Sequence, residues 1–173
     1  MTTSLTPTEL RDTVAMLSSP PLIRLITEID DNGPIPPRGL ARTLPDLSSH
    51  QLRQATDMAR TLGLLHVCPG AGLSLSTAGS ELADVYDATA RWARNHAYPN
   101  PISDFTTRVH HTLDLLAPQL LPATATGLRP PVDDHLSSAR ADANPDWPGD
   151  LLRQWLDTNS QAVRPAAASD LAA

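Results

Sequence analysis

Apolar residues recur every three or four positions along most of this chain, which is the spacing of one face of a helix. Residues 6–17 begin with Thr-Pro and carry a glutamate three positions after the threonine, as in an N-terminal capping box. Two further helices are predicted over residues 22–32 and 34–44, and the second, a short one, is expected to bury Leu40 and Leu44. The first 44 residues are therefore predicted to form three helices.

A fourth helix is predicted over residues 48–62, within "SSHQLRQATDMARTL". Either Ser48 or Ser49 can cap its start, and Gly63 follows its end. At 100° per residue, one side of this helix is largely apolar and is expected to face the core. That side comprises Leu52, Ala55, Thr56, Ala59 and Leu62.

The hydrophobic period changes from helical spacing to strict alternation after residue 63. Leu65 and Val67, then Leu73 and Leu75, flank the turn sequence "PGAG" and predict a short β-hairpin. Helical spacing returns in residues 77–96 and again after Ser103, which is expected to cap the later helix.

The remainder of the chain has a different composition. Residues 122–148 are dominated by Pro, Ala, Ser, Asp and Gly, a composition that buries too little surface to order itself. The short sequence "LLRQWLDT" after it predicts one last helix. Residues 122–173 are therefore expected to be a linker with a short terminal helix, partly disordered.

The composition supports a mostly α fold. Hydrophobic residues make up 40% of the 173 residues but aromatic residues only 3%, so the core must be mainly aliphatic. Strands favour aromatic and β-branched residues, whereas this mixture suits packed helices. The single cysteine, Cys68, excludes an internal disulfide and a cysteine-based zinc site.

Charge and hydropathy limit the partners and the location. The net charge of -6 argues against a nonspecific nucleic-acid coat, but residues 40–66 carry three arginines and two aspartates. No apolar run is long enough to span a membrane, and the first residues lack the features of a signal peptide. We expect a soluble, cytoplasmic protein without membrane association.

The order of elements from residue 21 to 95 is the layout of a winged helix-turn-helix domain. Within it, "LARTLPDLSSHQLRQATDMARTLGLL" followed by "LSLSTAGSEL" resembles the HxlR-type family of winged-helix bacterial regulators. The resemblance covers residues 20–96 and implies a three-helix core, a β-hairpin wing and DNA binding in transcription regulation. The chain departs from the family in its uncharged "PGAG" wing tip and in lacking an N-terminal cysteine, so redox sensing is not implied.

The helix over residues 48–62 would then read bases in the major groove. Its N-terminal half carries the predicted readers, since Gln and Arg can bond adenine and guanine edges in bidentate fashion. These readers are Ser49, His50, Arg53 and Gln54. Arg38 and Arg42 on the preceding helix are predicted to bind phosphates. On the residues alone, an ordinary solvated helix face is the competing interpretation.

We expect a homodimer that reads a pseudo-palindromic operator, because one small helix contacts too few bases. The predicted organisation is an N-terminal dimerisation helix (1–20), a DNA-binding domain (21–98), a C-terminal dimerisation helix (99–121) and the terminal segment (122–173). The predicted dimer seam comprises Leu10, Val14, Leu17, Phe105, Val109, Leu113 and Leu116. The alternative is that these stripes fold back on their own domain.

Other chemistry is weakly supported. No nucleophile elbow, Ser-His-Asp order or paired-carboxylate spacing is found, so we predict no enzyme, no cofactor and no metal. The adjacent His110 and His111 would point about 100° apart on a helix. A non-catalytic winged-helix module that binds protein is the alternative function, and no residue identifies a small-molecule effector.

Overall fold

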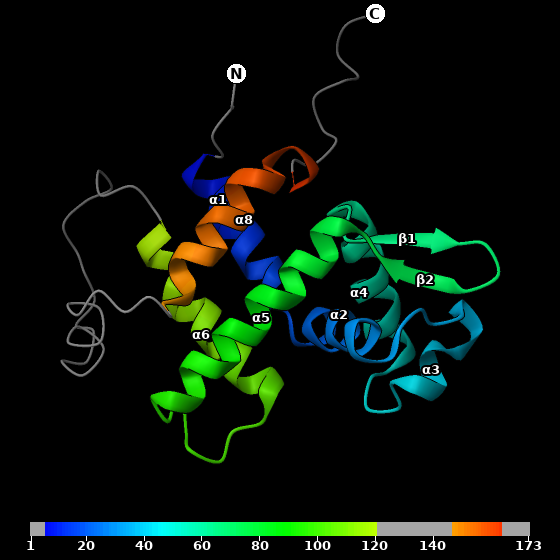
Figure 1. The fold of residues 1–173 in the computed structure, drawn as a ribbon, viewed down its shortest axis with the longest axis horizontal. Coiled ribbons are helices and arrows are strands. Elements are labelled where there is room, and N and C mark those ends of the chain that lie inside the picture. The colour runs from blue at the N-terminus through cyan, green and yellow to red at the C-terminus, as the bar shows by residue number, and fades with distance from the viewer. Residues whose placement is uncertain (1–5, 121–146, 164–173) are drawn as a thin grey trace, which may run out of the picture.

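The computed structural model describes residues 6–120 and 147–163 as a mostly helical fold with one small antiparallel sheet (Figure 1). In chain order the elements are α1 (Pro7–Leu17), α2 (Pro20–Asn32), the 3-10 turn η1 (Pro37–Gly39), α3 (Leu40–Thr43), α4 (Ser49–Thr61), β1 (Leu65–Cys68), β2 (Gly72–Leu75), α5 (Thr77–Asn95), α6 (Phe105–Leu120) and α8 (Pro148–Val163).

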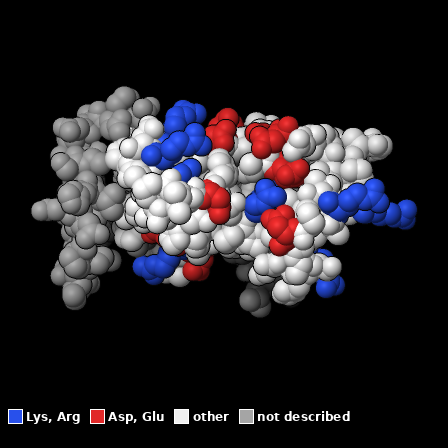
Figure 2. Space-filling view, turned by 90° about the horizontal axis from the view of Figure 1, so that it is seen from below, with Lys and Arg blue, Asp and Glu red and all other residues white. Residues whose placement is uncertain are grey.

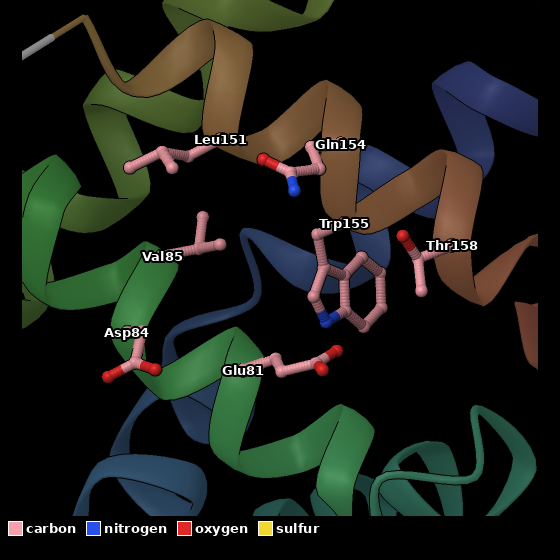
Figure 3. A pocket seen from close by; sticks show the side chains of 7 residues that line it. All are labelled: Glu81, Asp84, Val85, Leu151, Gln154, Trp155 and Thr158. Atoms are coloured by element: carbon pink, nitrogen blue, oxygen red, sulfur yellow. The ribbon is translucent and has the colours of Figure 1, made fainter. Parts of the chain in front are cut away.

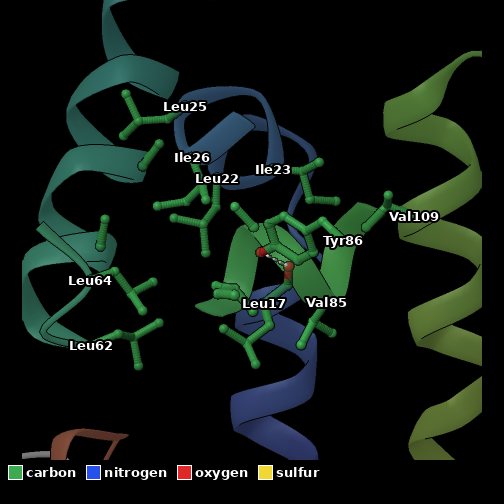
Figure 4. Close-up of a cluster of buried hydrophobic side chains, with 14 of the residues drawn as sticks. Leu17, Leu22, Ile23, Leu25, Ile26, Leu62, Leu64, Val85, Tyr86 and Val109 are labelled. Carbon is green, nitrogen blue, oxygen red and sulfur yellow. Dashed lines mark hydrogen bonds between the residues drawn. The ribbon is translucent and has the colours of Figure 1, made fainter. Parts of the chain in front are cut away.

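Helix α5 lies at the centre of the molecule and contacts α2, α6 and α8, while α2 packs against α4 on the other side (Figure 1). One hydrophobic core joins these helices with α1 and the start of the hairpin. Figure 4 shows side chains from α1, α2, α5 and α6 and from the segment after α4 converging on it. The predicted boundaries at residues 20 and 98 therefore do not separate independent cores.

Side-chain caps fix where the first and sixth helices begin. The Thr6 backbone N–H donates to Glu9 Oε2 at 2.8 Å and the Glu9 N–H donates to Thr6 Oγ1 at 3.3 Å, so the predicted capping box is confirmed. The expected cap of α6 was wrong by one residue. Asp104 Oδ1, rather than Ser103, accepts the Thr107 N–H at 2.8 Å.

The predicted hairpin is confirmed, with Leu65 opposite Leu75 and Val67 opposite Leu73. Ile35 joins its edge, because the Ile35 and Leu73 backbones exchange hydrogen bonds of 2.9 and 2.8 Å. Gly72 has a φ of 112°, and a Cβ there would collide with the Ile35 backbone. Val67 is 60% exposed, since the hairpin extends beyond the helices at this point (Figure 1).

Helices α1 and α6 pack against each other within the same chain. Their apolar stripes lie in the core, with Leu10 and Phe105 half-buried and the other five predicted seam residues buried. The Tyr86 hydroxyl donates to the Leu17 carbonyl at 2.7 Å, which ties α5 to the end of α1 (Figure 4). Burial raises the pKa of Tyr86. The stripes therefore fold back on their own chain, as the alternative interpretation held.

Helix α8 is longer than the predicted terminal helix and packs on α5 and α6. Leu152, Trp155 and Leu156 are buried, and Trp155 Nε1 donates to the Ala78 carbonyl at 3.0 Å. This segment is therefore part of the core. Residues 122–146 of the predicted linker and the tail after residue 163 lie outside the described residues, while Pro148, the last residue of that linker, begins α8.

Candidate nucleic-acid interface

Helix α4 is fixed at its start by a capping box. Ser48, one of the two serines considered, accepts the Gln51 N–H at 3.2 Å, and Gln51 Oε1 accepts the Ser48 N–H at 2.9 Å. Two backbone donors that would otherwise lack partners are thereby satisfied. The Gln51 side chain is consequently engaged in the helix start.

The end of α4 is a Schellman motif centred on Gly63, whose φ is 66°. The Gly63 N–H donates to the Arg60 carbonyl at 3.0 Å and the Leu64 N–H donates to the Ala59 carbonyl at 2.8 Å. Ser76 Oγ donates to the Gly63 carbonyl at 2.7 Å and also caps α5. These bonds hold α4 in a set position relative to α5.

The inner face of α4 agrees with the sequence prediction. All five residues expected to face the core are buried: Leu52, Ala55, Thr56, Ala59 and Leu62. The buried Thr56 hydroxyl donates to the Leu52 carbonyl at 2.7 Å, so it carries no unmet hydrogen bond. Because α2 packs against this face, the opposite face of α4 is left to solvent.

The four predicted readers, Ser49, His50, Arg53 and Gln54, are all exposed on this outer face. No acidic residue occurs between Ser49 and Thr56. Arg53 Nε donates to the Ser49 carbonyl at 3.3 Å, which holds the guanidinium against its own helix. The first two turns of α4 therefore present donors and a positive charge.

A shallow groove of about 290 Å³ lies between this face and the η1–α3 segment. It brings together three of the predicted residues, Arg38, Ser49 and Arg53. It also contains Arg60, which the sequence prediction did not include. The sequence does contain a signal for Arg60, which is its spacing from Arg53. Arg60 follows Arg53 by seven positions and therefore lies on the same side of α4. The basic residues that line the groove are Arg38, Arg53 and Arg60, and one acidic residue, Asp57, lies beside them.

The remaining predicted residues, Arg42, His50 and Gln54, are exposed but do not line this groove. Figure 2 shows basic side chains toward both ends of this face, including the end that carries α3 and the hairpin, and acidic side chains nearer the middle. The hairpin turn, residues 69–72, has no charged side chain. At the end of the molecule that carries the hairpin, the positive charge is therefore supplied by η1, α3 and α4 and not by the hairpin turn.

An ion pair fixes the turn that precedes α4. Arg24 Nε and Nη2 on α2 donate to Asp46 Oδ2 and Oδ1 at 3.0 and 3.3 Å. This bidentate contact holds the pKa of Asp46 below, and that of Arg24 above, its ordinary value. The turn leading into α4 is thereby tied to the helix on which α4 packs.

Replacing Asp46 by Asn is expected to reduce the free energy of unfolding at pH 7 by less than about 1 kcal/mol, because solvent screens this partly exposed pair. The folded pKa of Asp46 is depressed, so the contribution is present above the ordinary value of 3.8 and is lost as pH falls through the folded pKa. Urea unfolding of both proteins between pH 7 and pH 3 tests this. A stability difference that stays constant over this range would contradict it.

Other candidate chemistry lies away from this surface. His110 Nδ1–H donates to the Ser18 carbonyl at 2.8 Å, so this side chain links α6 to the α1–α2 junction. Within residues 6–120 and 147–163, no three His, Cys, Asp or Glu side chains group as a metal site would require. None of the helices in these ranges combines the length and apolarity needed to cross a membrane.

Comparisons with family models, curated proteins and solved structures found no match to this chain. The resemblance to HxlR-type regulators therefore depends on the sequence motifs alone. What the chain does must be inferred from the geometry of its own surface.

Proposed function

We propose that this chain is a sequence-specific DNA-binding transcriptional regulator of winged helix-turn-helix architecture, similar to the HxlR type. The observation that carries the proposal is the outer face of α4. Its N-terminal half exposes Ser49, His50, Arg53 and Gln54 on a helix whose opposite face is buried against α2. A recognition helix needs this division, because base edges are read by side chains near its N-terminus.

The residues around α4 supply phosphate contacts in this proposal. Arg38 and Arg42 precede α4 on η1 and α3, and both are exposed. Arg60 lies on the same groove as Arg38 and would add a third cation. Contacts of this kind set the register of a protein on the duplex without reading its sequence.

The β1–β2 hairpin corresponds to the wing in this architecture. Its turn holds Pro69, Gly70, Ala71 and Gly72 and no cation, so the proposal assigns phosphate binding to the arginines of η1, α3 and α4. The hairpin then contributes its shape, and no positive charge, to the proposed DNA-binding surface. Its position is held by the hydrogen bonds between Leu73 and Ile35.

A homodimer on a pseudo-palindromic operator remains part of the proposal, because a single reading helix gives few base contacts. The apolar stripes of α1 and α6 do not supply its interface, since they lie largely within the core of one chain. A dimer must therefore use other surface.

The proposal is tested by titrating the purified protein with promoter fragments from its genomic neighbourhood and with scrambled fragments, over a range of salt concentrations. Selective binding is expected, and its affinity should fall linearly with salt on a logarithmic scale. An Arg38→Ala, Arg42→Ala variant should weaken binding to all fragments and reduce the salt slope by about 2, with selectivity retained. Absence of selective binding at low salt would refute the proposal and favour a protein-binding module.

A further inference from the structure

A second concave surface lies between α5 and α8, away from the face of α4 (Figure 3). It is an open groove of about 290 Å³. Both helices contribute side chains to it: Glu81, Asp84 and Val85 from α5, and Leu151, Gln154, Trp155 and Thr158 from α8. Its volume is near the lower limit for small-molecule sites, about 300 Å³.

The groove has an apolar part. Leu151 is 43% exposed, although most large apolar side chains of α8 are buried. Val85 and Trp155 project into the space between the helices (Figure 3). Val85 and Trp155 are buried, at 5% and 3% exposure, and Trp155 Nε1 already donates to the Ala78 carbonyl. The indole therefore offers a ligand little surface and no donor, and Leu151 supplies the exposed apolar surface of the groove. An apolar or aromatic group could be partly desolvated here.

The rest of the groove is negative. Glu81 reaches from α5 toward the Trp155 ring, and Asp84 lies one turn further along (Figure 3). Glu81 Oε2 accepts a hydrogen bond from Asn159 Nδ2 at 3.4 Å, which steadies the carboxylate. Among the described residues, no basic side chain lines the groove. Its electrostatic character therefore favours a cation.

Acidic residues on α2 and α5 extend this negative surface beyond the groove. Burial, with repulsion from Asp31, Asp84 and Asp87, raises the pKa of Asp30. Burial, Asp31 and Asp84 also raise the pKa of Asp87, although Arg91 opposes them. Crowded carboxylates of this kind are relieved by a bound positive charge.

We propose that the α5–α8 groove binds a small organic cation that has a compact apolar body. The positive group would lie near the exposed carboxylates of Glu81 and Asp84. The apolar body would cover Leu151, beside the buried Val85 and Trp155. Neither the site nor its test depends on DNA binding.

Isothermal titration of the full chain with benzyltrimethylammonium tests the ligand class, with benzyl alcohol and phenylacetate as neutral and anionic comparisons. We expect saturable binding of the cation and much weaker binding of the other two. Failure of the cation to bind saturably would overturn the proposal. Equal binding of benzyl alcohol would overturn the assignment to cations.

Substitutions in and away from the groove test whether the cation binds there. A Glu81→Gln, Asp84→Asn variant should weaken binding of benzyltrimethylammonium by about tenfold, because two carboxylates lose their charge. Asp57→Asn removes an exposed carboxylate from α4, away from the groove, and should change the affinity by less than about twofold. Leu151→Ala, at a half-exposed position, should also weaken binding. An equal loss in Asp57→Asn, or no loss in the other variants, would place the cation elsewhere.

Discussion

An Arg53→Ala, Gln54→Ala variant is expected to lose the preference for promoter fragments over scrambled DNA while its melting temperature stays close to that of the parent. Both side chains are exposed on the outer face of α4, so their removal leaves the core unchanged. A bidentate base contact discriminates by about 1–3 kcal/mol, so two lost contacts reduce selectivity by about 30-fold or more. Competition binding measured at one fixed salt concentration gives this ratio.

The matched control is Arg94→Ala. It removes one arginine, as the double variant does, but from the exposed last turn of α5. Its selectivity should equal that of the parent. If the double variant keeps its selectivity, α4 does not read bases and the proposed function fails. The Arg38→Ala, Arg42→Ala variant distinguishes lost base contacts from lost phosphate contacts, because it should lower the affinity for all fragments and keep the selectivity.

Replacing Trp92 by Ala is expected to cause the largest loss of stability, about 3–5 kcal/mol. This indole is buried, stacks on the His96 ring at 4.4 Å and meets the Trp147 ring edge-on at 5.2 Å. Trp147 immediately precedes α8, so the cavity would also loosen the attachment of that helix. Urea unfolding followed by circular dichroism measures the loss, and hydrogen exchange in α8 should become faster.

Trp92→Phe is the control for this substitution. The Trp92 Nε1 atom has no hydrogen-bond partner among the described residues, so phenylalanine loses ring volume and no hydrogen bond. Its destabilisation should be clearly smaller, about 1–2 kcal/mol. A loss below about 1 kcal/mol for Trp92→Ala would show that the site collapses or that the contact with Trp147 contributes little.

The individual elements followed from the sequence where their signals are local. Ser48, Gln51 and Gly63 set the limits of α4 through hydrogen bonds that span three to five residues. The division of α4 into a buried and an exposed face followed from the helical period alone. The hairpin was also predictable from alternation around its glycine-containing turn.

The groove beside α4 was only partly predictable. Arg38, Ser49 and Arg53 were chosen for their chemistry, and all three line it. Arg60 was not included, because its role depends on how closely the η1–α3 segment approaches α4. The exposure of Val67 depends in the same way on how far the hairpin extends past the helices.

The sequence by itself determined most of the helical segments and which face of each is apolar. It missed the Asp104 cap of α6 and the full length of α8, and it predicted a helix over residues 34–44 where helical turns run only from Pro37 to Thr43. Tertiary structure decided what covers those faces: α1 and α6 cover each other, and α8 covers part of α5. The physical reason is that burial of an apolar stripe is favourable but non-directional, so the stripe does not specify which surface will cover it. The bonds that fix these partners join distant residues, such as Tyr86 with Leu17 and Trp155 with Ala78.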